Sequence, residues 1–393
     1  YDTKIIYINM MLKIVKTFWK IASSRIIFSK PKKTKTVIWG VPKYAKEILK
    51  QKKFNFEKIE FIEIWGESYN FYILLRCFFK LKFSLLDYSN EYIAYVNPKI
   101  ILSFLDNYRT FYKIKKNSSQ KKIIIQNSWR CNEFKFFEKN IGNSSNKVDY
   151  IFVQNINIKK KYQEISRSKV IATGSFLSNS IKIKNAQKKI DVLYVSTFRN
   201  YEKKKNIVIN KNIFLKDYID SEAKLIRNIH HVCEQNNKIL HILPGQKLDV
   251  QQMEKEFYQK ILGNKKNWKI IKRKNFNYKF PYKIVDKAKI VIGIDSTLLY
   301  EAFGRGIKTI FCDIRPKNKF LEKTRHFAWP KKYLKQGFFW LNKNDPKIIN
   351  KVFLNVLKIK NEKWKSIFKK YNQNLMIYNK NNTQFTKIIN QKK

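Results

Sequence analysis

Short runs of β-branched and aromatic residues alternate with amphipathic segments along most of the chain. Apolar runs of this length between turn residues predict strands, and apolar positions three and four apart predict helices. In the first half, strands are expected at Thr36–Trp39, Ile59–Ile64, Ile100–Phe104, Ile123–Gln126, Tyr150–Val153 and Val170–Ala172. Strands that alternate with helices in this way are typical of parallel α/β architecture.

The same alternation restarts after a polar stretch, Ser178–Lys189, which we interpret as a linker with the boundary near residue 185. Strands are predicted at Val192–Val195, Ile239–Leu243, Trp268–Ile271, Ile290–Ile294 and Thr309–Cys312. Helices are predicted at Ser221–Gln235, Val250–Leu262, Ser296–Phe303, Pro346–Ile359 and Glu362–Tyr371. The second half therefore predicts another parallel sheet with its own helices.

With 393 residues, the chain is long enough for two domains, each with its own core. The predicted fold class is α/β, with two doubly wound, Rossmann-like domains that face each other across a cleft. The predicted divisions are a basic N-terminal segment (1–34), an N-terminal domain (35–184), a C-terminal domain (185–372) and a basic polar tail (373–393). Ligands of such sheets bind outside the carboxyl ends of the strands, so the cleft is the predicted active site.

The formal net charge of +54 first suggests a nucleic-acid or membrane partner. Only eleven of the 83 basic residues are arginine, and Lys, Asn, Ile, Phe and Tyr, which share AT-rich codons, are all abundant. Lysine is also spread over nearly every segment, whereas a nucleic-acid reader concentrates its charge and uses arginine forks. We therefore attribute the charge to coding bias. The four widely spaced cysteines indicate neither a disulfide framework nor a zinc site, which fits a reducing cytoplasm.

No uninterrupted apolar run approaches the roughly 20 residues that span a bilayer. The nearest, Ile5–Phe28 and Phe71–Leu86, are broken by Lys or Arg, and the first has no cleavage site of the signal-peptide kind. Each segment is either a core helix with Lys on its solvent-exposed face or an amphipathic segment that contacts an anionic inner membrane. The chain opens on Tyr1 rather than Met, so we expect either that the true start is missing or that it is Met10 or Met11. The expected location is cytoplasmic, with a peripheral position at the inner membrane left open.

The segment from Ile290 to Asp313 carries the most chemistry, because it predicts a strand, a turn, a helix, a glycine stop and a second strand. Ser296 or Thr297 is a good N-cap, and the unpaired N–H groups of the first helical turn can hold a diphosphate. Glu301 lies one turn further on nearly the same side, where its carboxylate could accept from two ribose hydroxyls. The alternative is an ordinary βαβ unit with a capped helix.

The pattern Asp295-Ser-Thr-x-x-Tyr-Glu-Ala-x-x-x-Gly306 resembles the nucleotide-binding segment of GT-B glycosyltransferases and of the related sugar-nucleotide 2-epimerases. Further segments resemble a family of bacterial surface carbohydrate biosynthesis proteins, so that the resemblance covers roughly residues 36 to 372. Those segments are Val148–Asn155, Ile171–Phe176, Phe327–Pro330 and Gly337–Trp340.

The resemblance implies a nucleotide-sugar site in the second domain, with Ser296 and Thr297 at phosphate and Glu301 at ribose. Many GT-B enzymes place a glycine-rich loop after the first strand of this domain, but here the loop is Ser196-Thr197-Phe-Arg199, without glycine. Arg199 is then a candidate side-chain contact to phosphate. The predicted nucleotide-sugar residues are Ser296, Thr297, Glu301, Asp295, Ser196, Thr197, Arg199 and Gly245, the last in a turn that either lines the donor site or is a plain turn.

Sugar transfer needs a base for the acceptor hydroxyl and cationic or N–H groups for the leaving phosphate. Arg130 and Glu133 follow one strand end of the first domain and Asp106 follows another, so these three are the catalytic candidates. For each of them, a solvated loop charge or a helix cap is the alternative. No histidine has a carboxylate partner at a recognisable spacing, and the sequence has no DxD metal motif. We predict neither a metal nor a cofactor, with the nucleotide-sugar as substrate.

The sequence thus predicts a glycosyltransferase that moves a sugar from a nucleotide-sugar donor to an acceptor glycan or lipid-linked saccharide. A sugar-nucleotide epimerase of related fold is the nearest alternative, although the first domain offers few of the acids and histidines that it would need. An alternative of another class is a non-catalytic protein that binds polyanions or a membrane surface through its lysines.

Overall fold

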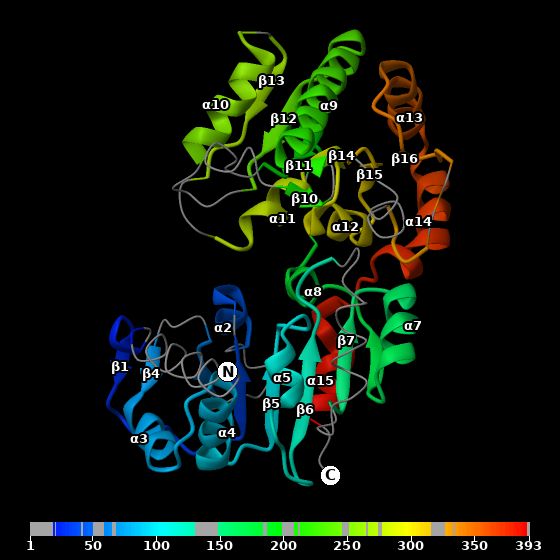
Figure 1. Ribbon diagram of the computed structural model, residues 1–393. Helices are drawn as coiled ribbons and strands as arrows, with labels where there is room; N and C mark the ends of the chain where they lie inside the picture. The colour runs from blue at the N-terminus through cyan, green and yellow to red at the C-terminus, as the bar shows by residue number, and fades with distance from the viewer. Residues whose placement is uncertain are drawn as a thin grey trace, which may run out of the picture.

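The computed structural model describes residue 19 and residues 21–40, 42–49, 59–64, 68–129, 148–183, 187–198, 208–210, 213–245, 251–264, 266–273, 277–315, 327–331, 333 and 335–390. These residues form two α/β units, one above the other in Figure 1, and each is built on a six-stranded sheet. The predicted boundary near residue 185 falls between the last strand of the first sheet and the first strand of the second.

The first sheet has the order β3-β2-β5-β6-β7-β8, and all of its strand pairs are parallel. The chain leaves β2 toward β3 on one side and returns to β5 on the other, so the order reverses between β2 and β5. The strands are β2 (Thr36–Trp39), β3 (Ile59–Ile62), β5 (Ile100–Ser103), β6 (Lys121–Ile125), β7 (Tyr150–Val153) and β8 (Lys169–Ala172). All six were predicted, with ends that differ by two residues at most.

The second sheet repeats this topology with the order β13-β12-β9-β14-β15-β16, again entirely parallel. Its order reverses between β9 and β14, and such a reversal leaves a crevice at the carboxyl ends of the strands. The strands are β9 (Ile190–Val195), β12 (Leu240–Leu243), β13 (Trp268–Ile270), β14 (Ala288–Gly293), β15 (Lys308–Cys312) and β16 (Trp340–Leu341). The expected fold, two doubly wound domains, is confirmed.

The helices of the first domain are α2 (Lys43–Leu49), α3 (Phe71–Phe79), α4 (Leu85–Val96), α5 (Arg109–Lys113), α7 (Ile156–Ile165) and α8 (Phe176–Ser180). Beside them, β1 (Arg25–Ile27) pairs in parallel with β4 (Ser68–Asn70). The apolar stretch Phe71–Leu86 is therefore α3 and the start of α4. The turn between them has Leu81 at φ 53°, and Ser84 and Asp87 form a capping box that starts α4.

The helices of the second domain are α9 (Leu215–Gln235), α10 (Gln251–Leu262), α11 (Phe280–Val285), α12 (Thr297–Gly304), α13 (Pro346–Lys358) and α14 (Asn361–Leu375). A short hairpin, β10 (Val208–Asn210) with β11 (Ile213–Phe214), precedes α9 in a stretch where the sequence predicted neither a strand nor a helix. None of the described helices combines the length and the apolar character that a bilayer span requires.

The chain returns to the first domain after α14, which corrects the expectation of a basic polar tail over residues 373–393. A 3₁₀ turn, η5 (Lys380–Asn382), leads into α15 (Thr383–Asn390), which Figure 1 shows in red against the first domain. The Phe385 ring lies 5.1 Å from Phe152 and 5.2 Å from Phe176, and Phe385 is 1% exposed. This return segment, residues 376–390, completes one face of the first core because its apolar residues recur at helical spacing.

Glycine is required at the point where the return segment meets the first domain. Gly174 has φ +82°, and a Cβ there would lie 1.9 Å from the backbone oxygen of Ile377. Gly174 and Tyr378 form an isolated antiparallel bridge. Asn179 donates to Asn382 Oδ1 at 3.0 Å, so hydrogen bonds fix the same crossing. A side chain at position 174 would push the two backbones apart.

Candidate functional site

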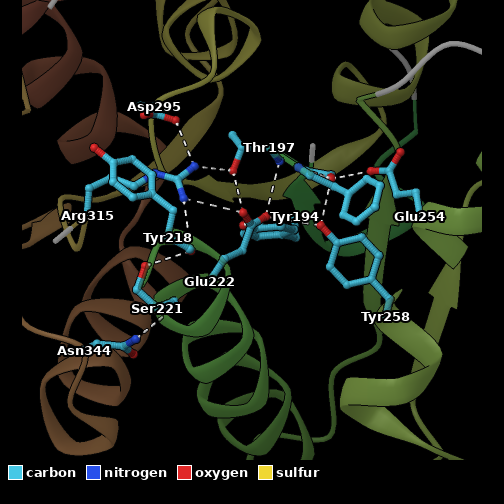
Figure 2. Close-up of polar contacts among 12 residues, drawn as sticks. Tyr194, Thr197, Tyr218, Ser221, Glu222, Glu254, Tyr258, Asp295, Arg315 and Asn344 are labelled. Carbon is cyan, nitrogen blue, oxygen red and sulfur yellow. Dashed lines mark hydrogen bonds and ion pairs between the residues drawn. The ribbon is translucent and has the colours of Figure 1, made fainter. Parts of the chain in front are cut away.

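Four polar residues and one glycine follow four neighbouring strands of the second sheet, within three residues of each strand end. Ser196 and Thr197 come after β9, Gly245 after β12, Asp295 after β14 and Arg315 after β15. Because β12, β9, β14 and β15 are adjacent and parallel, these residues meet at one edge of the sheet, and Figure 2 shows the polar contacts of Thr197, Asp295 and Arg315 there. All of them except Arg315 were predicted at the donor site.

Glu222 of α9 lies at the centre of this edge, although it is only 1% exposed. Its carboxylate accepts hydrogen bonds from the Tyr194 hydroxyl at 2.8 Å and from Thr197 Oγ1 at 2.9 Å. The Thr197 backbone N–H also donates to it at 3.3 Å. Glu222 therefore fixes the turn after β9 from below through both main-chain and side-chain contacts (Figure 2).

Arg315 is the cation that faces Glu222, at 3.7 Å from Nη1 to Oε2. Its Nη2 donates to Thr197 Oγ1 at 2.8 Å and to Asp295 Oδ1 at 3.4 Å, and its guanidinium lies 5.0 Å from the centre of the Tyr218 ring. The Arg315 side chain is 7% exposed, whereas that of Asp295 is 44% exposed. One buried guanidinium thus ties the ends of β9 and β14 together and leaves Asp295 at the surface of the edge.

A second buried carboxylate, Glu254 of α10, holds the same turn from the other side. It accepts from Ser196 Oγ and, at 3.1 Å, from the Gly245 backbone N–H. A Cβ at Gly245 would lie 2.8 Å from the Ser196 carbonyl oxygen, so the approach of the two turns requires glycine. In this structure, Gly245 serves the packing of the strand ends.

Two tyrosines complete the buried part of the network. Burial, followed by the charge of Glu222, raises the pKa of Tyr194 and of Tyr258 well above the ordinary value. Both hydroxyls therefore stay protonated at neutral pH, and the Tyr258 hydroxyl lies 2.7 Å from Ser196 Oγ. Neutral hydroxyls that donate to buried carboxylates make a rigid base under the edge.

The N-terminus of α12 lies beside this network and faces the first domain. Ser296 is the N-cap residue, but its side chain makes no capping hydrogen bond to the first turn. Thr297 Oγ1 instead accepts from the backbone N–H of Trp129 at 3.0 Å, and the Trp129 ring stacks on Tyr300 with 3.6 Å between centroids. The loop after β6, which the sequence placed at the cleft, thus contacts the predicted nucleotide segment through Trp129.

Glu301 lies further along α12, buried between the two domains. Its carboxylate accepts from Ser175 Oγ of the first domain and, at 2.8 Å, from the Tyr282 hydroxyl of α11. Burial raises the pKa of Glu301 from 4.5 to about 7, and the two hydrogen bonds and the nearby charge of Arg305 oppose this rise. In this conformation the side chain expected at ribose links the domains.

Replacing Glu301 by Gln is expected to remove a pH dependence of stability between about pH 4.5 and 7. An acid with a higher pKa in the folded state binds a proton more readily when the protein is folded. Its contribution to the free energy of unfolding is therefore most favourable below its unfolded pKa and is lost as pH rises through its folded pKa. The full difference is about 3 kcal/mol for a shift of this size. Urea unfolding at a series of pH values measures this. The free energy of unfolding of the variant should rise relative to that of the wild type as pH rises.

Glu362→Gln is the matched control, because Glu362 is exposed on α14. The difference in unfolding free energy between this control and the wild type should stay nearly flat over the same pH range. Parallel curves for wild type and Glu301→Gln would contradict the buried, protonatable state of Glu301.

Besides the pair of Glu222 and Arg315, the second domain has another buried ion pair, between Arg305 and Asp286, which lies near Glu301. Its Nε and Nη2 donate to the two carboxylate oxygens of Asp286 at 3.0 and 2.8 Å. Its Nη1 donates to the carbonyls of Ser178 and Ile181, at the end of α8 in the first domain. One guanidinium therefore joins the second domain to the segment that connects the domains.

The catalytic candidates of the first domain are only partly described. Asp106 is 0% exposed, and its carboxylate accepts from the Tyr162 hydroxyl of α7 at 2.7 Å, so it anchors α7 below the strand ends. Arg130 and Glu133, together with Arg199 of the second domain, lie outside the described residues. Within the described ranges, no group of three or more His, Cys, Asp or Glu is placed to hold a metal ion.

Several residues of this arrangement were not predicted, although two carried a signal. Glu222 precedes Leu225, Ile226 and Ile229 by three, four and seven residues, which places an acid on the buried stripe of its helix. Glu254 precedes Tyr258 and Leu262 by four and eight residues, which also places it on the buried side of its helix. An ionisable group on an apolar stripe must be paired, so such positions indicate a buried network. The other unpredicted residues are Trp129, Ser175, Tyr194, Tyr258, Tyr282, Asp286, Arg305 and Arg315.

The arrangement of the two sheets defines the class of protein: it has the two-domain GT-B fold. Similar structures include a "putative UDP-N-acetylglucosamine 2-epimerase" from Listeria monocytogenes (TM-score 0.52, 14% identity, 88% of this chain and 93% of that chain). The UDP-GlcNAc 2-epimerase of Methanocaldococcus jannaschii is also similar (TM-score 0.50, 12% identity, 90% of this chain and 98% of that chain). A third is the H444N variant of the wall teichoic acid polymerase TagF (0.52, 12%, 91% and 89%).

By sequence, residues 123–393 match the family described as "putative O-antigen biosynthesis protein", and the chain belongs to this family. None of the curated proteins matches the chain. The family connects the chain with the synthesis of a surface polysaccharide, and the resemblance to surface carbohydrate biosynthesis proteins is thereby confirmed.

Proposed function

We propose that the protein is a glycosyltransferase that binds a nucleotide-activated sugar on its second domain and an acceptor glycan or lipid-linked saccharide on its first. The proposal is supported by the family and the fold, and one observation carries it. The N-terminus of α12, without a capping bond from Ser296, lies beside the network of Glu222, Arg315 and Asp295 at the carboxyl edge of the sheet.

The donor diphosphate would bind at the first turn of α12. The N–H groups there and the positive end of the helix dipole favour an anion, and the Ser296 hydroxyl can donate to it. Arg315 is a positioning residue in this proposal, because Glu222 balances its charge while it holds Thr197 and Asp295. Arg199 is the proposed side-chain contact to phosphate. Contact of Glu301 with ribose would replace the hydrogen bond from Ser175, so donor binding would loosen one contact between the domains.

Transfer would join the acceptor oxygen to the anomeric carbon of the sugar as the bond from that carbon to the diphosphate breaks. The base accepts the proton of the acceptor hydroxyl. We assign this role to Glu133, because the Asp106 carboxylate is buried against Tyr162. Arg130 would offset charge on the leaving diphosphate, with the N-terminus of α12 on its other side. We propose no obligatory metal, since the sequence has no DxD motif.

A thermal-shift screen against UDP, GDP, CMP and their common sugars tests the donor site. A ligand that binds only the folded state at a hundred times its Kd adds about 2.7 kcal/mol of stability, which corresponds to a rise in Tm of roughly 5–10 °C. Ser296→Asp should abolish this rise, because aspartate is a good N-cap but places a negative charge where the diphosphate would bind. Ser84→Asp, the same change at the N-cap of α4, is the control and should keep the rise.

The proposal fails if no nucleotide raises Tm, or if Ser296→Asp responds like the wild type. Strong stabilisation by heparin alone would favour a protein that binds polyanions. Incubation of the binding nucleotide-sugar without acceptor separates the enzyme classes, since an epimerase converts the sugar under these conditions and a transferase leaves it unchanged.

A further inference from the structure

The described surface carries a group of large exposed apolar side chains at the outer end of the first domain. Phe78, Phe79 and Leu81, at the end of α3, are 55%, 80% and 78% exposed, and Phe28 beside β1 is 65% exposed. Figure 1 shows α3 and β1 at the left-hand end of the first domain. We call Phe28, Phe71, Phe78, Phe79 and Leu81 the aromatic patch.

The patch is held in place from beneath by α3, which has two apolar faces. Ile73 and Cys77 form the buried face, at 0% and 4% exposed. Phe71 and Phe78, seven residues apart, lie on another side of the helix with the adjacent Phe79, and these side chains are 37%, 55% and 80% exposed. A helix with apolar residues on its solvent side is expected to have a partner there.

The β1 strand is fixed to the same surface. The Asn70 side chain donates to the Ser29 carbonyl at 2.7 Å and accepts from the Ile73 N–H, so it joins the end of β1 to the start of α3. The Phe28 ring then lies 5.2 Å from the Phe71 ring. The aromatic rings are therefore presented together by a rigid support.

Positive charge surrounds the patch. Arg76, Lys80 and Lys82 share one carboxylate, Glu91, at 3.4, 2.8 and 3.2 Å, which leaves two positive charges in excess, and the three cationic side chains are 43–47% exposed. Lys30 lies 5.4 Å from the centre of the Tyr72 ring. Exposed phenylalanines among cations suit the boundary between acyl chains and anionic headgroups.

We propose that the aromatic patch docks the protein on an anionic lipid bilayer. Phe78, Phe79 and Leu81 enter the boundary between headgroups and acyl chains, while Lys80 and Lys82 lie at the headgroup phosphates. A second copy of the chain is a poorer occupant, because a formal charge of +54 on each copy opposes self-association. The contact would place the first domain against the membrane, and it stands apart from the donor site.

Vesicle flotation tests the contact, with vesicles of phosphatidylglycerol and phosphatidylcholine compared with phosphatidylcholine alone. The wild type should float with the anionic vesicles. Phe78→Ser with Phe79→Ser should weaken binding by at least about tenfold, since binding scales with buried apolar area. Lys80→Gln with Lys82→Gln should weaken it by up to about 30-fold, because each cation near the surface contributes about fivefold.

Lys365→Gln with Lys369→Gln, two exposed positions on α14, is the charge-matched control and should float like the wild type. The exposed positions of Phe78, Phe79, Lys365 and Lys369 predict an unchanged Tm for the variants at these sites, which circular dichroism checks. Lys80→Gln with Lys82→Gln removes two of the three cations that pair with the buried Glu91, so its Tm is expected to fall, and its flotation is measured well below that Tm. Unchanged flotation of the Phe78, Phe79 variant would overturn the proposal and assign any binding to the dispersed lysines or to residues 1–18. Conversion of a dimer to a monomer by the same variant, in light scattering without vesicles, would assign the patch to self-association instead.

Discussion

Replacing Glu222 by Ala is expected to lower the free energy of unfolding by about 3–5 kcal/mol, the cost of removing one member of a buried ion pair. Arg315 and the Tyr194 hydroxyl would lose their contacts with this carboxylate while they stay buried. Glu222→Gln keeps the shape of the side chain and one acceptor oxygen, so it should lower the free energy of unfolding by less, about 1–3 kcal/mol. Urea unfolding followed by circular dichroism measures both.

Asp220→Ala is the control, because Asp220 is exposed on the same helix two residues away. A loss for Glu222→Ala no greater than that of Asp220→Ala would contradict the central place of Glu222 in the network. The variant should also lose part of the thermal shift given by the nucleotide, since Arg315, which holds Thr197 and Asp295, would lose the carboxylate that faces it.

Arg305→Ala is expected to cost a similar amount, about 3–5 kcal/mol, because it removes the guanidinium that pairs with the buried Asp286 carboxylate, at 4% exposed. The carbonyls of Ser178 and Ile181 would lose a charged donor at the same time. Arg305→Lys should recover little, since lysine cannot reproduce the two parallel hydrogen bonds to Asp286. For a unit of this size, Tm should fall by roughly 10 °C, measured by differential scanning calorimetry.

Arg227→Ala serves as the control for Arg305, because Arg227 is exposed on α9 and its loss should change Tm little. A separate measurement locates the effect. Limited proteolysis of Arg305→Ala should cut first between β8 and β9, where Arg305 otherwise holds α8 to the second domain. Equal protection of this segment in variant and wild type would contradict the role of Arg305 in joining the domains.

The core of both sheets could be predicted from the sequence because buried parallel strands are continuous apolar runs between turn residues. The strand ends that carry Ser196, Thr197 and Asp295 followed directly from those runs. The break between α3 and α4 was signalled by the spacing of Ser84 and Asp87 but was hidden by the apolar residues on both sides.

The contacts between the domains could not be predicted in the same way. Ser175 reaches Glu301 across 126 positions of the chain, and Trp129 reaches Thr297 across 168. Local sequence patterns do not indicate which loops of two separate sheets contact each other. The burial of Glu301 follows from such contacts. The sequence predicted a carboxylate within reach of ribose, whereas in the structure this carboxylate is buried and accepts from Ser175 and Tyr282. α15 escaped prediction because Phe385, Ile388 and Ile389 are few among Lys, Asn and Gln.

The return segment has a consequence for how the chain is made. Phe104, Phe152 and Phe176 emerge from the ribosome early in synthesis. Phe385, which packs in the same core, emerges on the order of tens of seconds later. Until then, one face of the first core lacks its cover, even though every strand of that sheet has already been synthesised. The domain that is translated first is therefore completed last. A nascent chain stalled before Phe385 should bind chaperones that recognise exposed aromatic surface, and release of α15 should end that binding.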